Sequence, residues 1–153
     1  MASNELRHDQ KMSDCCSTSC NTNHPNRRQC PGNGAECSEV SARTISHHIK
    51  AAWNWSASVE HYYFCDAPDC DVVYFGEDGS TISKSRLCTR SAAKDQSGDA
   101  LICHCFGICR DDFARDPDIK DFVVAQTKAG VCSCEIYNPS GRCCLKDFQK
   151  HRN

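Results

Sequence analysis

Residues 61–75, HYYFCDAPDCDVVYF, contain two short aromatic and β-branched runs on either side of a tight polar segment. Runs of this kind, bounded by Asp and Pro, are typical of two β-strands joined by a turn. Cys65 stands at one end of the turn and Cys70 at the other. A hairpin at this point would therefore direct two sulfur atoms toward one place.

The strand pattern extends on both sides of this hairpin. Residues 77–80 (EDGS) are a turn signal, and residues 81–87 can return as a third strand. Upstream, Ile45, Ile49 and Trp53 recur at helical spacing and predict a short helix. We therefore expect a small β-rich module over residues 30–88.

The carboxy-terminal part shows a helical pattern instead. One helical face collects the side chains of Ile119, Phe122, Val123 and Gln126. Pro117 and Gly130 stand where helices commonly begin and end, and a last helix is expected from about residues 142–144.

Four segments follow from these patterns. Residues 1–29 are expected to form a flexible polar tail, and the small, polar residues 89–100 a linker. A small helical module over residues 101–153 follows the β-rich module, so the predicted fold class is α+β.

Fifteen cysteines dominate this chain of 153 residues. Its apolar runs are too short to span a bilayer, and its first residues lack an apolar signal core, so a cytoplasmic location is expected. In a reducing compartment, this many cysteines indicate metal ligands rather than a disulfide framework. The formal charge of −2 offers no basic field for nucleic acid.

The first thiol set lies in the β-rich module and comprises Cys30, Cys37, Cys65 and Cys70. Two cysteine pairs around strands are typical of a closed, four-thiolate zinc site. The gap between Cys30 and Cys37 is wider than in most zinc knuckles, so His47 or His48 remains open as a replacement for Cys37. The alternatives are buried free thiols and an ordinary polar helix face for the histidines.

The second thiol set comprises Cys103, Cys105, Cys132, Cys134, Cys143 and Cys144. Iron–sulfur clusters take four thiolates, although the common ferredoxin spacings are absent here. Neighbouring side chains diverge, so Cys143 and Cys144 are not expected to serve together, and His104 should point away from the ligands. On spacing alone, a 2Fe–2S cluster and a second zinc ion both remain open.

Three strings of the sequence resemble the amino-terminal domain of CopZ-type copper chaperones: residues 63–75, CHC at 103–105 and NPSGRCC at 138–144. The resemblance runs from about residue 30 to residue 145. It implies a zinc-binding module followed by a helical module similar to bacterioferritin-associated ferredoxin, with a 2Fe–2S cluster. The cluster ligands that it implies are Cys103, Cys105, Cys134 and Cys144.

Two features depart from the pattern of that family. Asn33 stands where the family has a cysteine, and we expect Cys37 to compensate. The sequence also has no Cys-x-x-Cys, the copper loop of the heavy-metal-associated domain in full-length CopZ-type proteins. Copper delivery through such a loop is therefore not expected.

The sequence predicts a non-enzymatic iron–sulfur and zinc protein for electron transfer and copper handling in heavy-metal homeostasis. Reduction of cupric to cuprous ion before transfer is one expected task, and Lys128, Arg142 and Lys146 would offset the charge of the thiolates. The expected partners are metal ions and either a copper- or mercury-handling protein or a redox partner. Binding to nucleic acid or to a membrane is not expected. The alternative is a structural adaptor with two zinc ions.

The remaining cysteines are assigned less specifically. Cys15, Cys16 and Cys20 lie in the polar tail, where soft thiolates suit cuprous (Cu⁺) or mercuric ion. The alternative of equal weight is that these cysteines are exposed, oxidation-prone thiols without a role. Cys88 and Cys109 are expected to be buried or spare cysteines.

Overall fold

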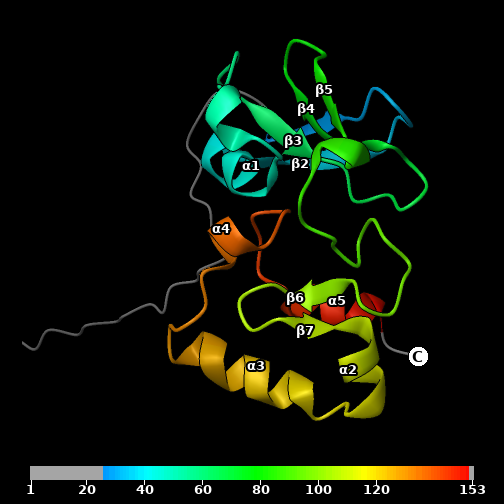
Figure 1. The fold of residues 1–153 in the computed structure, drawn as a ribbon, viewed down its shortest axis with the longest axis vertical. Coiled ribbons are helices and arrows are strands. Elements are labelled where there is room, and N and C mark those ends of the chain that lie inside the picture. Colours follow the sequence, from blue (N-terminus) through cyan, green and yellow to red (C-terminus); the bar gives the residue numbers. More distant parts are fainter. Residues whose placement is uncertain (1–25, 152–153) are drawn as a thin grey trace, which may run out of the picture.

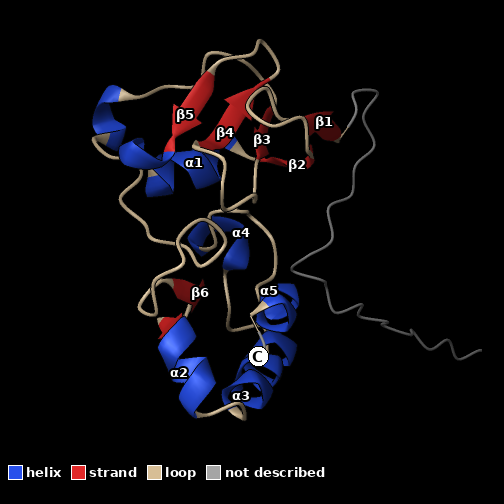
Figure 2. Cartoon of the chain, turned by 90° about the vertical axis from the view of Figure 1, so that its right-hand side faces the viewer, coloured by secondary structure: helices blue, strands red, loops and turns tan. Residues whose placement is uncertain are grey.

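The computed structural model describes residues 26–151, which form two modules stacked along the long axis of the molecule (Figure 1). The first module is a five-stranded antiparallel sheet with one helix, and the second is a group of helices beside a two-stranded sheet. Helix α4 lies between the two modules in both views (Figures 1 and 2). The predicted α+β class is confirmed.

The five strands of the first sheet follow one another in chain order. They are β1 (Arg27–Gln29), β2 (Glu36–Val40), β3 (Tyr62–Phe64), β4 (Val72–Gly76) and β5 (Thr81–Ser83). The predicted hairpin is the β3–β4 pair, in which Tyr63 faces Phe75 across the strands. The third strand is shorter than predicted, because residues Lys84–Arg86 turn into the 3-10 helix η2.

Strand β1 begins the sheet earlier than the sequence predicted. Arg28 pairs with Cys37 in β2, whereas residues up to 29 were assigned to the tail. All three residues of β1 are exposed, so this edge strand carries no apolar alternation that sequence reasoning can detect. Cys15, Cys16 and Cys20, for which a soft-metal site is one prediction, lie outside the described residues.

The first module has one α-helix, α1 (Ala42–His48), which ends sooner than predicted. Ser41 caps it by accepting a hydrogen bond from the backbone N–H of Thr44. Ala51 then takes a left-handed conformation, and a separate 3-10 helix, η1 (Ala52–Asn54), follows. Ile45 and Ile49 are buried, but Trp53 is 85% exposed, so its assignment to the same helical face was wrong.

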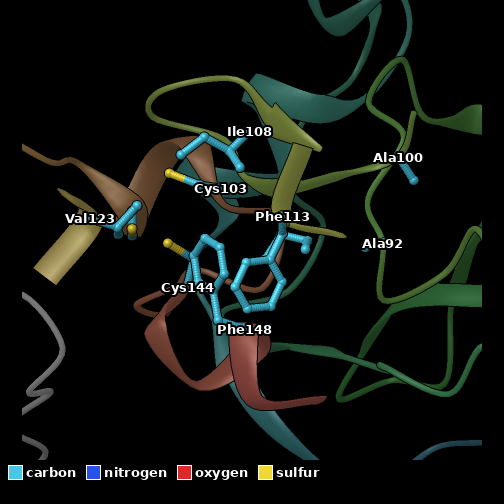
Figure 3. Close-up of a cluster of buried hydrophobic side chains, with 10 residues drawn as sticks. Ala92, Ala100, Cys103, Ile108, Phe113, Val123, Cys144 and Phe148 are labelled. Atoms are coloured by element: carbon cyan, nitrogen blue, oxygen red, sulfur yellow. The ribbon is translucent and has the colours of Figure 1, made fainter. Parts of the chain in front are cut away.

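The second module joins a small sheet to four helices. The sheet consists of β6 (Leu101–Cys103) and β7 (Ile108–Cys109), and the helices are α2 (Arg110–Arg115), α3 (Ile119–Lys128), α4 (Cys134–Tyr137) and α5 (Leu145–Lys150). Phe113 and Phe148 pack edge to face in its core, with 4.9 Å between ring centroids (Figure 3). Val123 of α3 is buried, as its place on the predicted helical face suggests, whereas Phe122 is 48% exposed and packs edge to face against Phe106.

Side-chain contacts join the two modules directly. The Thr44 hydroxyl of α1 donates to the carbonyl of Glu135 in α4 at 2.6 Å, and the Tyr74 hydroxyl donates to the carbonyl of Pro139 at 2.5 Å. In the segment 89–100, Ala92 and Ala100 are buried in the core of the second module. Within residues 26–151, the structure contains no helix long and apolar enough to cross a membrane.

Candidate metal centres

Three cysteines of the first module meet at one point. Cys30 follows β1, Cys65 follows β3 and Cys70 precedes β4, and their sulfur atoms all lie within 4.8 Å of one another. All three are buried, and the Cys30 and Cys70 sulfurs are 3.9 Å apart. Within residues 26–151, no other group of three or more Cys, His, Asp or Glu side chains brings its possible metal-ligating atoms within 4.8 Å of one another.

The β3–β4 hairpin positions this group by dividing its side chains between two faces. Tyr62, Phe64 and Tyr74 pack in the buried cluster that includes Ile45 of α1. Tyr63 and Phe75 stack on each other in the cluster that contains the thiols, with 5.4 Å between ring centroids. The alternation of side chains along a strand thus separates the hydrophobic support from the thiol face.

The turn after Cys30 approaches the thiols with its backbone. The N–H of Gly32 donates to the Cys30 sulfur at 3.3 Å. A Cβ atom at Gly32 would lie only 2.8 Å from the Cys70 sulfur, so a larger residue cannot occupy the position without a shift. Burial raises the pKa of Cys30, but hydrogen bonds from the backbone of Gly32 and Asn33, together with those from the Cys65 and Cys70 thiols, outweigh it and lower the pKa overall. The turn therefore favours a thiolate, the form that binds metal.

Cys37, the fourth predicted ligand, lies in the same buried cluster but outside the group of three. Its thiol donates to the carbonyl of Ala35 at 3.3 Å. Burial, reinforced by the charge of Cys65 and Cys30, raises the pKa of Cys37 to about 12. The structure therefore brings three of the four predicted zinc ligands together and places Cys37 beside them as a neutral thiol.

The predicted histidine alternatives to Cys37 are directed elsewhere. His48 is within 2.6 Å of the Thr89 hydroxyl through Nδ1 and 2.8 Å of the Ile136 carbonyl through Nε2. Burial lowers the pKa of His48 to about 4, so the ring is neutral. His47 packs against the ring of Tyr137. Both histidines therefore serve the joint between α1 and α4.

Lys94 is a residue of the first centre that sequence reasoning missed. It was assigned to a linker, yet its ammonium group is buried against the Cys65–Cys70 loop. Its hydrogen-bond acceptors lie 22 and 27 residues away in the chain, so no local sequence signal could have revealed them.

The four predicted cluster ligands lie together in the second module. Cys103 is on β6, Cys134 begins α4 and Cys144 precedes α5, and all three are buried in one core with Phe148. Figure 3 shows Cys103 and Cys144 beside Val123 in this core. The Cys105 sulfur is partly buried and lies 3.8 Å from that of Cys134.

These four thiols form an elongated set. Hydrogen bonds from Cys103 and Cys134 lower the pKa of Cys144 to about 4. The same contacts raise the pKa of Cys103 and Cys134. The contacts therefore run from Cys103 through Cys144 and Cys134 to Cys105, and no three of the four sulfurs lie within 4.8 Å of one another.

The two spare thiols of this region flank the set. A hydrogen bond with Cys143 is the largest cause that raises the pKa of Cys134. Cys132 lies on the other side, with its sulfur 3.7 Å from the Thr127 hydroxyl. Both are only partly buried, whereas Cys144 is 1% exposed.

His104, between two predicted ligands, packs toward α1. Its ring lies edge-on to that of His48 with 6.2 Å between centroids. Burial lowers the pKa of His104 to about 3, and its buried Nε2 has no hydrogen-bond partner among residues 26–151.

The remaining sequence predictions concern the three cationic residues expected near the cluster thiolates and the two cysteines without an assigned role. Arg142 donates to the Ser38 hydroxyl in β2 at 3.0 Å, so its guanidinium reaches into the first module. Lys128 and Lys146 are exposed. Of the two cysteines expected to be buried or spare, Cys88 is exposed, and Cys109 is partly buried and caps α2 through Asp112.

Comparison with known proteins identifies the family to which this chain belongs. A CopZ family model described as a zinc binding domain matches residues 27–88. The copper chaperone CopZ of Archaeoglobus fulgidus is 33% identical over 119 residues, which are 76% of this chain and 57% of that protein. The X-ray structure of the A. fulgidus CopZ N-terminal domain matches with a TM-score of 0.67 and 30% identity, covering 80% of this chain and 96% of that domain. The chain therefore belongs to the family of the CopZ amino-terminal domain, with its zinc binding domain at residues 27–88.

Proposed function

We propose that this protein handles copper with two separate metal centres. A zinc ion would be held by Cys30, Cys65 and Cys70 with Cys37, and a 2Fe–2S cluster by Cys103, Cys105, Cys134 and Cys144. The relation to a copper chaperone supports metal handling, and the different shapes of the two thiol sets support the division of labour.

The first thiol set suits a single tetrahedral ion. With metal–sulfur distances of about 2.3 Å, tetrahedral ligands lie about 3.8 Å from one another. Cys30, Cys65 and Cys70 approach this arrangement, since their sulfurs all lie within 4.8 Å. Cys37 of the same buried cluster would complete the shell after giving up its bond to Ala35. A closed shell of this kind is structural and would stabilise the small sheet.

The shape of the second thiol set is the observation that carries the cluster proposal. Three sulfurs of the first set lie within 4.8 Å of one another, as ligands of one tetrahedral ion must, whereas no three sulfurs of the second set do. A cluster with two irons takes a pair of thiolates on each iron, which an elongated set can provide. The N–H of Ser133, which donates to the Cys105 sulfur at 3.2 Å, would stabilise the thiolate there.

Such a cluster, when bound, accepts and releases one electron at a time. One electron reduces one cupric ion to one cuprous ion, the form that soft thiolate carriers bind. We therefore assign the second module to this reduction, with a redox partner as the source of the electron and a copper-handling protein as the recipient of the ion. The cytoplasm is the compartment that fits this assignment.

Metal and sulfide analysis of protein purified without oxygen tests this proposal. We expect about two irons, two sulfides and one zinc per chain. We also expect visible absorption that bleaches on reduction. Two zinc ions per chain, with neither iron nor sulfide after reconstitution, would contradict the cluster and support the two-zinc adaptor instead.

A further inference from the structure

Lys94 is a buried cation beside the first thiol set. Its side chain is 7% exposed, and among residues 26–151 it is the one lysine or arginine that is buried. The ammonium donates to the carbonyl of Ala67 at 2.5 Å and to that of Val72 at 2.9 Å. These carbonyls lie on either side of Cys70, so Lys94 ties together the two ends of the loop that carries this ligand.

The charge of Lys94 needs a partner that the hydrogen bonds do not supply. Burial of a cation is costly unless negative charge lies nearby, and both acceptors are neutral carbonyls. The groups that act on it electrostatically are the thiols of Cys65, Cys70 and Cys30, which favour its charge, and the Lys84 ammonium, which opposes it. A zinc ion with four thiolates carries a net charge of −2, which would provide the missing partner.

We propose that Lys94 is a positioning residue of the zinc centre, which holds the Cys65–Cys70 loop and balances the charge of the zinc-bound thiolates. The inference rests on the proposed zinc ion. Lys94 lies beyond residues 27–88, which the zinc binding domain model matches. The centre therefore extends past that domain, into the segment that connects the two modules.

The segment around Lys94 is itself held by the second module. Arg110 of α2 donates through Nη2 to the carbonyl of Ala92 at 2.7 Å and to that of Asp95 at 2.9 Å. These two acceptors flank Lys94 in the chain. Support of the zinc loop thus passes from α2 through this segment to the thiols.

The chain offers a matched control for Lys94. Lys84 donates to the carbonyl of Pro68 in the same loop at 2.8 Å, but this bond lies at the surface. Lys84→Met therefore removes a hydrogen bond to the loop together with a surface charge, whereas Lys94→Met removes a hydrogen-bonded charge that is buried.

The test uses the full-length, zinc-loaded chain and its Lys94→Met, Lys94→Arg and Lys84→Met variants. Zinc release to excess chelator is timed, and alkylation of each cysteine by iodoacetamide is followed by mass spectrometry. Loss of a group that supports metal ligands commonly weakens a site by 10–100-fold. We expect Lys94→Met to release zinc at least about tenfold faster and to alkylate faster at Cys65 and Cys70, because unbalanced thiolates are more nucleophilic. Lys84→Met should match the wild type, and Lys94→Arg should restore slow alkylation.

The outcomes separate this inference from the proposed zinc centre. A wild-type chain that binds no zinc would remove both. Zinc bound normally, with Lys94→Met equal to Lys84→Met in release and alkylation, would overturn the inference alone. If Lys94→Met does not fold, amine acylation of the wild type decides. Lys94 should be protected with zinc bound and acylated faster without it, and equal rates would contradict the proposal.

Discussion

At the scale of single residues, the close approach of backbone and sulfur explains the first centre. The N–H of Gly32 contacts the Cys30 sulfur, and the absence of a side chain leaves room for Cys70. A neighbouring glycine, Gly34, has a φ of +76° but open space around the position of a Cβ atom. One glycine is thus required by space and the other by backbone conformation.

Gly32→Ala should therefore weaken zinc binding. Its methyl group would meet the Cys70 sulfur at 2.8 Å and displace a ligand. Gly34→Ala is the matched control, which should lower the free energy of unfolding by about 1 kcal/mol through its left-handed backbone but keep zinc. Zinc per chain after dialysis against a weak chelator measures both. Equal zinc retention in the two variants would show that the approach of Gly32 is not needed.

The choice among crowded thiols is also a question of single residues. Cys134→Ser and Cys144→Ser should abolish the cluster, because both side chains are buried within the thiol set and serine is a harder ligand. Cys132→Ser and Cys143→Ser, on its flanks, should change the visible spectrum only modestly. Iron content and spectra of the four variants, purified without oxygen, decide. Cluster loss in Cys143→Ser with retention in Cys144→Ser would reverse the assignment.

At the scale of elements, α1 and α4 form the joint between the modules. His48 spans this joint with both ring nitrogens in hydrogen-bonding range of partners. Its neutral form is favoured by burial, which lowers its pKa from 6.5 to about 4. The joint should therefore respond to acid.

The folded state should lose stability as the pH falls from 6.5 toward 4. The pKa of His48 is lower in the folded chain than in the unfolded one. The contribution of neutral His48 to folding stability is therefore complete above pH 6.5, and it is lost at lower pH as the His48 ring of the unfolded chain becomes protonated. A shift of this size corresponds to about 3 kcal/mol. His48→Gln should flatten the pH dependence relative to the exposed control His47→Gln. Denaturant unfolding of both zinc-loaded variants from pH 7 to 4.5 measures it, and identical slopes would contradict the role of His48.

Sequence reasoning succeeded where a pattern is local. The β3–β4 hairpin follows from the two aromatic and β-branched runs of residues 61–75, and the end of α3 from Gly130, whose φ is +73°. It failed where tertiary contacts decide. Strand β1 is exposed on every residue, Trp53 lies beyond a left-handed turn at Ala51, and Lys94 meets acceptors far away in the chain.

At the scale of the whole molecule, the two modules are joined closely enough to influence each other. The Tyr74 hydroxyl links β4 to the carbonyl of Pro139, and Arg142 reaches Ser38 in β2. Both Pro139 and Arg142 belong to the NPSGRCC string at residues 138–144, which ends with Cys143 and Cys144. That string therefore fixes the second module to the first as well as carrying a ligand.

Tyr74→Phe should loosen this attachment. It leaves a buried carbonyl without its donor, which costs about 1–3 kcal/mol. Because Pro139 precedes Cys144 by five residues, the variant should also lose its cluster faster in air. Tyr62→Phe is the control, since the Tyr62 hydroxyl bonds locally to Ser58. Thermal unfolding and the decay of visible absorption measure the two effects, and equal behaviour of the variants would contradict the attachment.

The central claim, two chemically different centres in two modules, is tested most directly by anomalous diffraction from crystals grown without oxygen. Data at the zinc and iron absorption edges locate each element independently of the ligands assumed. The account predicts a zinc peak among Cys30, Cys65 and Cys70, and iron among Cys103, Cys105, Cys134 and Cys144. Zinc at both positions, with no iron signal in crystals of reconstituted protein, would contradict it.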